Sequence, residues 1–442
     1  MRSWLIALAL TSLPWMAQQA VPETATLLAS AISRHDLAWQ LSEPDEVKGV
    51  VGAPDAEDTR RDGGMEVRSW HYGESVEVFF VRQFGSTAPF VLAGARNGTR
   101  RLGPEPGGRL VLRNLADLSK LRPFTGLQNV DASRLDLRNE EARLRNMTFD
   151  TRTVWPPADR LPPGFDPTAL LPDGKNPGLG IRALHARGID GRGVTIGVVD
   201  QPLLDHVETR GRLTMVARLD VDGVPPQMHG PAVASLAAGA SSGVAPRAHV
   251  AYVAIPMWKT QQDNALYINA LERLLEWTAD GQARVRVVSI SWGEFESAAG
   301  ADRWRALLAK AESQGVFVIT CDLSGSRLEY GMLAPLPGGN RDQPEAYVKG
   351  SYGSGLLVPG DGRTYAHHEG AEDYAYGPKG GMSWGAPYVA GVAALGFQVN
   401  PDLTPARIRA YLMRSATKMP YGSVINPAAF VRLCQDDPDR AR

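Results

Sequence analysis

The sequence predicts an α/β fold with a mainly parallel sheet in its C-terminal part, preceded by a small α+β module. The first observation is a series of short β-branched runs, each suited to a strand buried on both faces, at residues 194–199, 250–255, 285–290 and 316–320. The second is that amphipathic segments lie between the later runs, at 265–277 and 304–314. Strands alternating with helices are typical of a parallel sheet flanked by helices.

The first 20 residues resemble a signal peptide. Arg2 precedes a short apolar run at residues 4–15 (WLIALALTSLPW), and a run of this length is too short to span a bilayer. We therefore expect export of the chain, to a secreted or periplasmic location, and no membrane span after the signal is removed.

Residues 21–100 are predicted to form the small α+β module. An Ala/Leu-rich stretch at 24–41 favours a helix, and a shorter helix ends at the glycine of 46–52. Residues 65–72 and 75–81 alternate apolar and polar side chains around Gly73, which predicts a β-hairpin.

Residues 101–175 are predicted to form a leucine-rich bridge followed by a proline-rich arm. The leucines that recur between 110 and 137 resemble one or two leucine-rich repeats, too few for an independent solenoid. The stretch at 155–177 is dense in proline, as an extended arm is. Residues 176–442 are then predicted to form the α/β domain.

Composition excludes several classes of function. The formal net charge is −1 and no Lys/Arg run stands out, which argues against nucleic acid and anionic lipid as partners. The two cysteines, Cys321 and Cys434, match no zinc-ligand spacing and no dense disulfide framework. The sequence does not indicate an oligomeric state.

Three polar residues carry the candidate chemistry. Asp200 directly follows the first strand run, and functional residues collect at the carboxyl ends of such strands. His229 begins a small-residue helix, and Ser383 begins another, where unpaired N–H groups suit a developing oxyanion. Taken alone, each residue is also typical of a helix cap or a packing position. Together they supply a nucleophile, its base and the carboxylate that orients the base.

These segments resemble the motifs of the subtilase family. The aspartate motif Asp-Thr/Ser-Gly is matched by DQP at 200–202, and the histidine motif HGTHVAG by HGPAVAS at 229–235. The serine motif GTSMASPHVAG is matched by GMSWGAPYVAG at 381–391. The turn GVAP at 243–246 and the triplet SWG at 291–293 also resemble the family, in the same order along the chain.

The resemblance implies a subtilisin-like fold and a serine endopeptidase that hydrolyses protein or peptide substrates through an acyl-enzyme, with residues 176–442 as the catalytic domain. It implies Asp200, His229 and Ser383 as the catalytic triad. Its substrate-binding strand end corresponds to Ser291, Trp292 and Gly293. Calcium is implied by the resemblance alone, because no metal or cofactor site is identifiable in the sequence.

The sequence also fits the G-x-S-x-G elbow of α/β-hydrolases at 381–385. That fold places its catalytic histidine after the serine, and the last histidines here are His367 and His368. The order Asp, His, Ser is that of subtilisins. The chain order therefore excludes the lipase or esterase interpretation.

One departure from the family leaves a second interpretation open. The family's oxyanion asparagine follows the strand that corresponds to 315–320, where this chain reads CDLSGS. The candidates for a replacement are Ser324, Asp322 and Asn340. The alternative is a catalytically inactive subtilase-like binding or scaffold protein.

Overall fold

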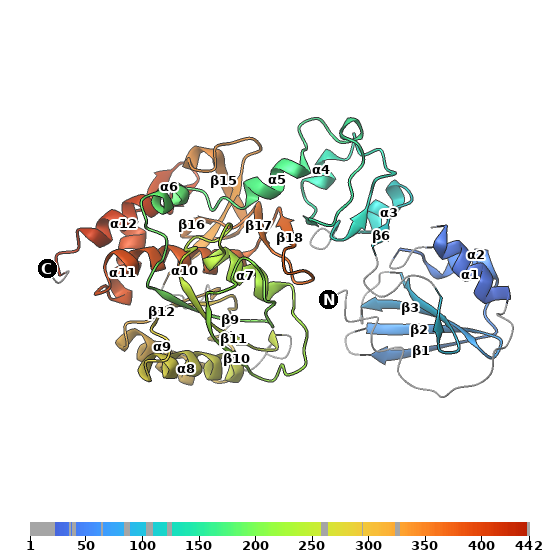
Figure 1. Ribbon diagram of the computed structural model, residues 1–442, viewed down its shortest axis with the longest axis horizontal. Helices are drawn as coiled ribbons and strands as arrows, with labels where there is room; N and C mark the ends of the chain where they lie inside the picture. Colours follow the sequence, from blue (N-terminus) through green and yellow to red (C-terminus); the bar gives the residue numbers. More distant parts are fainter. Residues whose placement is uncertain are drawn as a thin grey trace. The chain divides into compact units, whose positions relative to one another are not determined.

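The computed structural model describes most of the chain after its first 22 residues, in two compact units (Figure 1). The described residues are 23–34, 37, 41–62, 65–83, 89–102, 109–121, 126–257, 264–293, 295–322 and 328–439. The expected signal peptide lies outside them. The first unit comprises residues 1–141 and 152–165, and the second comprises residues 142–151 and 166–442.

The first unit begins with two helices and an antiparallel sheet. The helices are α1 (Glu23–Ser33) and α2 (Pro44–Val51). The sheet runs in chain order through β1 (Ala56–Asp62), β2 (Met65–Tyr72), β3 (Val76–Gln83), β4 (Val91–Asn97) and β5 (Arg100–Arg101). The predicted hairpin is confirmed, because Tyr72 pairs with Val76 across the turn that contains Gly73. Leu28, Trp70 and Phe80 lie in the core that the helices and the sheet share.

The leucine-rich stretch forms short parallel pairings in the same unit. Its elements are β6 (Leu110–Val111), α3 (Leu115–Lys120), β7 (Val130–Asp131) and the 3-10 helix Ala158–Arg160. Strand β6 pairs in parallel with β7, and Asp131 bridges in parallel to Val154. Successive turns therefore stack on one another, as in a leucine-rich repeat, with buried leucines Leu112, Leu118, Leu127, Leu135 and Leu137.

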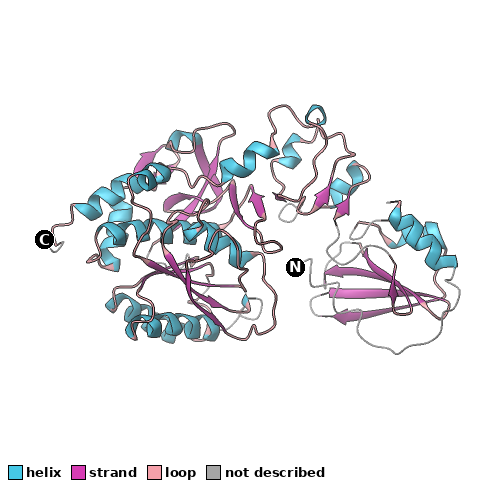
Figure 2. Cartoon of the chain, in the orientation of Figure 1, coloured by secondary structure: helices cyan, strands magenta, loops and turns pink. Residues whose placement is uncertain are grey.

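The second unit is built around a parallel sheet, which confirms the predicted fold class (Figure 2). Its strands lie in the order β10 (Leu213–Arg218), β11 (His249–Ala254), β9 (Thr195–Asp200), β12 (Val285–Ile290) and β13 (Phe317–Thr320). The β-branched runs predicted every strand except β10. That strand lies at an edge of the sheet and exposes alternate residues, so its sequence lacks a continuous apolar run.

Helices cover both faces of this sheet (Figure 1). Helices α7 (His229–Ala238) and α10 (Met382–Val399) pack on one face, and their small residues allow close approach. Helices α8 (Ala265–Ala279) and α9 (Ala301–Ser313), both predicted from their apolar spacing, pack on the other. Because β9 and β12 end between these layers, the residues that follow them lie at one edge of the sheet.

The remainder of the second unit surrounds this core. One sheet runs β15 (Tyr347–Gly353), β14 (Tyr330–Pro335), β16 (Leu356–Pro359), β20 (Gly422–Val424) and β19 (Thr417–Met419). Another runs β17 (Arg363–Ala366), β18 (Tyr374–Gly377) and β8 (Phe149–Asp150). The other helices are α4 (Glu141–Leu144), α5 (Pro167–Gly174), α6 (Ile181–Ala186), the 3-10 helix Pro344–Ala346, α11 (Pro405–Arg414) and α12 (Pro427–Gln435).

None of the helices in the described ranges has the length and apolar content needed to cross a membrane.

Candidate active site

Asp200 and His229 face each other at the carboxyl end of the parallel sheet. His229 Nδ1 lies 2.8 Å from Oδ1 and 3.0 Å from Oδ2 of Asp200. The Asp200 side chain is fully buried, whereas the His229 side chain is 16% exposed. A carboxylate in this position favours the tautomer that carries its proton on Nδ1, which leaves Nε2 to act as the proton acceptor.

The local sequence explains why this contact forms. Asp200 is the last residue of β9 and His229 the first of α7, so each side chain is fixed by the end of a buried element. The two segments approach closely at Gly230, where a Cβ atom would overlap the carbonyl oxygen of Gln201. That carbonyl accepts a hydrogen bond from the Tyr252 hydroxyl at 2.5 Å. Glycine at 230 is therefore required for the start of α7 to lie against the end of β9.

Ser383 is the second residue of α10, which begins at Met382 directly after Gly380 and Gly381. Its Oγ donates to the carbonyl oxygen of Ser291 at 3.4 Å, and Ser291 Oγ donates to the carbonyl oxygen of Ser383 at 3.0 Å. Within the described residues, the Ser383 hydroxyl therefore contacts Ser291 and not His229. Catalytic hydrogen bonds are often long or misaligned in the absence of substrate, and rotation about the Cα–Cβ bond redirects a serine hydroxyl.

The residue after Ser383 brings the starts of α10 and α7 together. The Trp384 ring lies edge-on to the His229 imidazole, with ring centroids 5.3 Å apart and planes at 76°. The nucleophile and base candidates thus belong to two helices that begin at the same place. The structure brings Asp200, His229 and the residue next to Ser383 into one cluster.

Comparison with known proteins agrees with this arrangement. Residues 191–322 and 335–430 match the sequence model of the Subtilase family, which is more than half of the chain. The chain belongs to the subtilase family. Family membership supports serine peptidase activity, with proteins as substrates.

Individual relatives of this subtilase are distant. It is 28% identical to Subtilisin BL and to Subtilisin Savinase, both from Lederbergia lenta, over 272 and 274 residues that cover 57% of this chain and 95% of each relative. It is 25% identical to the Subtilisin-like protease PopC of Myxococcus xanthus, over 54% of this chain and 59% of that protein. Among solved structures, it is similar to the A-subunit of the AB5 toxin from E. coli at 20% identity, with a TM-score of 0.45, over 60% of this chain and 99% of that one.

The subtilase places a cysteine beside Ser383 from the segment that follows β13. Cys321 lies within hydrogen-bonding reach of the Ser383 side chain, and the Tyr330 hydroxyl is 3.4 Å from its Sγ. Burial raises the pKa of the Cys321 thiol to about 12, so the group is a neutral thiol. Sequence analysis missed this residue. The alternation of side chains along a strand was the signal that could have found it.

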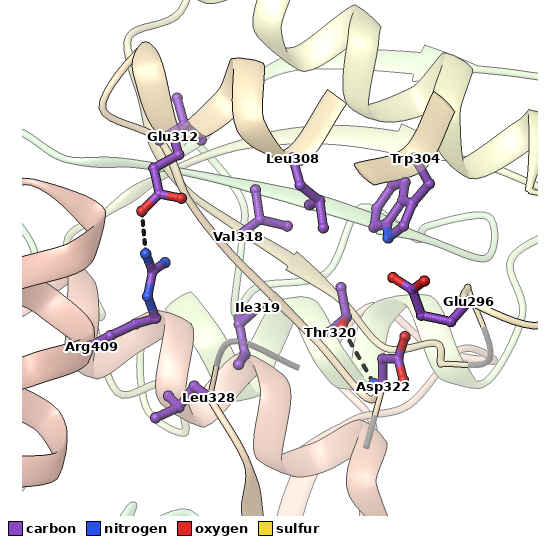
Figure 3. Close-up of a pocket in the computed structure, with 11 residues that line it drawn as sticks. Glu296, Trp304, Leu308, Glu312, Val318, Ile319, Thr320, Asp322, Leu328 and Arg409 are labelled. Carbon is purple, nitrogen blue, oxygen red and sulfur yellow. Dashed lines mark hydrogen bonds and ion pairs between the residues drawn. The ribbon is translucent and has the colours of Figure 1, made fainter. Parts of the chain in front are cut away.

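Asp322 faces a groove along the edge strand β13 (Figure 3). Its carboxylate lies near that of Glu296 at one end of the groove, and the ion pair of Glu312 with Arg409 lies at the other. The Asp322 amide donates to Thr320 Oγ1 at 3.3 Å. Asp322, one of the three oxyanion candidates, is therefore held at the edge of β13. Its neighbour Cys321 lies against Ser383.

The other two candidates for an oxyanion donor are Ser324 and Asn340. Ser324 lies outside the described residues. Asn340 is exposed, and its side-chain oxygen accepts a hydrogen bond from the Asp342 amide at 3.0 Å. The same loop is tied to the start of the domain, because the Leu179 amide donates to the Arg341 carbonyl. The described contacts of Asn340 are thus local to its loop.

The predicted substrate-binding triplet connects β12 to the active-site elements. Ser291 makes the reciprocal hydrogen bonds with Ser383, and the Trp292 carbonyl accepts from the Cys321 amide at 2.7 Å. The Trp292 ring stacks on Tyr267 of α8, with centroids 5.8 Å apart. Gly293 lies so close to Cys321 that a Cβ atom would come within 2.9 Å of the Cys321 carbonyl oxygen. The triplet therefore aligns the segments that follow β12 and β13.

The buried carboxylate of Glu208 is satisfied by hydrogen bonds from the protein itself. Glu208 accepts from the Ser241 amide at 2.9 Å, from the Ser242 amide at 3.1 Å and from the Tyr374 hydroxyl at 2.6 Å. Burial favours a higher pKa for Glu208, but these hydrogen bonds together hold its pKa below the ordinary value. Within the described ranges, no group of three or more His, Cys, Asp or Glu side chains is placed to hold a metal ion. Calcium binding stays an expectation from family resemblance.

Proposed function

We propose that this subtilase is a serine endopeptidase in which Ser383 is the nucleophile, His229 the general base and Asp200 the residue that orients the base. The observation that carries the proposal is the contact between the buried Asp200 carboxylate and His229 Nδ1 at 2.8 Å. A buried carboxylate on one imidazole nitrogen leaves the other nitrogen to exchange a proton with a nucleophile.

The proposed reaction uses the three side chains in turn. Ser383 Oγ attacks the carbonyl carbon of the scissile peptide bond while its proton passes to His229 Nε2, which forms an imidazolium that Asp200 stabilises. The tetrahedral intermediate collapses to an acyl-enzyme, and His229 gives its proton to the leaving amine. Water then attacks the ester, with His229 again as base, and releases the acid product and Ser383.

The oxyanion is stabilised in part by the start of α10. Ser383 is the second residue of that helix, so its amide has no carbonyl partner within the helix. An amide at a helix N-terminus points at developing negative charge and adds the favourable end of the helix dipole. A second donor comes from the segment after β13, where Ser324 is the sequence-based candidate.

Covalent labelling by a fluorophosphonate tests the proposal, because the reaction needs the nucleophile and its base together. Wild-type protein should gain one label, on the peptide that contains Ser383. Ser383→Ala should abolish labelling, and His229→Ala should slow it by several orders of magnitude, with poor additivity between the two changes.

A second candidate is a catalytically inactive subtilase-like binding protein. The observation that favours it is the absence of an asparagine from the described residues that directly follow β13, Cys321 and Asp322. Removal of one oxyanion donor costs roughly 10²–10³ in turnover, which reduces activity without abolishing it. An unlabelled wild-type protein that unfolds cooperatively would favour the inactive candidate and reject the peptidase.

We also propose that the protein acts outside the cytoplasm, in a secreted or periplasmic location. The support is the charged and apolar sequence of residues 1–20. N-terminal sequencing of the exported protein tests this proposal, with a start near residue 18 or 21 as the expected result. Recovery of the full-length chain from the cytoplasm alone would reject it.

A further inference from the structure

Trp384 lies between the imidazole of His229 and a second buried aromatic ring. Its ring is edge-on to His229, with centroids 5.3 Å apart, and edge-on to Tyr365 of β17, with centroids 5.2 Å apart and planes at 88°. Only 6% of Trp384 is exposed. Ala232, Leu236 and Ala375 complete the same apolar cluster. Trp384 is therefore held on one side by the protein core and on the other by the active-site imidazole.

The Trp384 indole occupies this position at a cost in hydrogen bonding. Its Nε1–H is excluded from solvent and has no hydrogen-bond partner among the described residues. A buried donor without a partner costs free energy that a phenylalanine would not cost. Hydrogen bonding therefore does not account for a tryptophan here, and the large ring that reaches both His229 and Tyr365 does.

The loop before Ser383 is shaped around this ring. A Cβ atom on Gly380 would lie 2.7 Å from Trp384 Cγ and would also overlap the carbonyl oxygen of Gly360. The Gly380 amide donates to Asp361 Oδ1 at 2.9 Å, which fixes the loop. The position of Trp384 is therefore set by the Gly380 backbone, which precedes Ser383 in the chain, and by helix α10, which contains Trp384.

His229 needs such a contact, because its bonds to Asp200 constrain only one edge of the imidazole. Nδ1 is held by the two carboxylate oxygens, and the side chain remains 16% exposed. A ring tied at one atom can still tilt, and a tilt moves Nε2 away from the serine hydroxyl. Packing against a perpendicular aromatic ring restricts that tilt and adds favourable edge-to-face interaction.

We infer that Trp384 is a positioning residue that holds the His229 imidazole for proton transfer with Ser383. The inference rests on the proposed function, since it assigns Trp384 a role in the same reaction. The family motif quoted above has methionine at this position, so the packing of a tryptophan ring against the histidine is a feature of this chain. A misplaced general base slows the chemical step and leaves ground-state binding unchanged.

The test measures fluorophosphonate labelling of Trp384→Leu and Trp384→Phe over a range of reagent concentrations, which separates the maximal labelling rate from the reagent's apparent dissociation constant. Trp384→Leu should lower the maximal rate about tenfold and leave the dissociation constant unchanged. Trp384→Phe keeps a ring beside His229 and should stay within about threefold of wild type.

The matched control is Trp277→Leu, because Trp277 in α8 is also 6% exposed and has no described contact with His229 or Ser383. It should lower the melting temperature and leave the maximal labelling rate unchanged. If Trp384→Leu does not fold, Trp384→Met takes its place, because an unbranched side chain fills irregular space. The same slowing is expected.

The outcomes separate this inference from the proposed function. A wild-type protein that takes no label rejects the proposed function. A labelled wild type combined with a folded Trp384→Leu or Trp384→Met variant that reacts within twofold of it rejects the role of Trp384. Slow labelling in Trp384→Leu together with equally slow labelling in Trp277→Leu also rejects it, because the effect is then one of general core damage.

Discussion

Ser291 and Ser383 hold each other through reciprocal hydrogen bonds between side chain and main chain. Ser291 Oγ donates to the Ser383 carbonyl at 3.0 Å, and Ser383 Oγ donates to the Ser291 carbonyl at 3.4 Å. The pair joins the end of β12 to the start of α10. The candidate nucleophile is therefore positioned by the same strand end that resembles the substrate-binding triplet of the family.

Ser291→Ala removes the donor that fixes the Ser383 carbonyl. A typical hydrogen bond contributes about 1 kcal/mol, which corresponds to roughly a fivefold effect. We therefore expect labelling of Ser383 to slow about fivefold. Ser289→Ala is the matched control, because Ser289 lies two residues earlier in β12, is buried, and has an Oγ without a partner among the described residues. Equal rates in the two variants would show that the reciprocal bond does not position Ser383.

Ser324→Ala and Asn340→Ala test the second oxyanion donor. Loss of a true donor should slow acylation by at least about tenfold, because a single donor typically contributes roughly 10²–10³ in turnover. We expect the loss in Ser324→Ala and not in Asn340→Ala, since the Asn340 side chain bonds within its own loop. An active-site titrant measures the acylation rate. If neither variant is slowed, backbone amides alone form the hole.

Glu208→Gln should lower the free energy of unfolding at neutral pH. It should also make that free energy depend less on pH in the acid range. The pKa of Glu208 is lowered in the folded state from its ordinary value of 4.5, because hydrogen bonds from Ser241, Ser242 and Tyr374 outweigh burial. Its stabilising contribution is thus complete above pH 4.5 and is lost as pH falls through the folded pKa. We expect Glu208→Gln to lose about 2 kcal/mol at pH 7, on the scale of hydrogen bonds to a charged group. Urea unfolding at several pH values measures both effects.

Asp361→Asn should change the pH dependence of stability in the opposite direction to Glu208→Gln. Burial raises the pKa of Asp361 above its ordinary value of 3.8, although the Gly380 amide donates to it. A raised carboxyl pKa gives a contribution that is present below pH 3.8 and is lost as pH rises through the folded pKa. Asparagine keeps an acceptor for Gly380 and carries no charge. The variant should therefore gain stability relative to wild type as pH rises, and a stability difference that is constant with pH would contradict this.

Phe149→Ala tests the prediction that the region before Asn176 stays with the active protein. Phe149 is 1% exposed in β8, which pairs with β18 in the second unit, and its ring lies 5.1 Å from that of Tyr376. Truncation of a buried phenylalanine costs about 3–5 kcal/mol. The melting temperature of the purified active protein should fall accordingly.

N-terminal sequencing of the same material completes this test. A mature start between residues 156 and 177, with an unchanged melting temperature in Phe149→Ala, would identify the earlier region as a removed propeptide. Phe79→Ala, in the sheet of the first unit, is the control and should leave unfolding of the second unit unchanged.

The sequence by itself determined the elements whose physical pattern is local. Runs such as VTIGVV and VRVVSI are mostly apolar and rich in β-branched residues, so they predict strands buried on both faces, and the spacing in α8 and α9 predicts helices. The order of Asp200, His229 and Ser383 also lies in the sequence. It was enough to separate a subtilase from an α/β-hydrolase, because chain order does not depend on three-dimensional distances.

Only the tertiary structure decided which side chains meet. Strand β10 escaped prediction because an edge strand exposes alternate residues, and β8 because two residues form a strand only when β18 provides the hydrogen bonds. Cys321 and Asp322 are neighbours in sequence, yet Cys321 lies beside Ser383 and Asp322 faces the groove along β13. The contact of Trp384 with His229 joins two helices far apart in the chain. Such contacts depend on how the layers pack, which no local pattern of residues specifies.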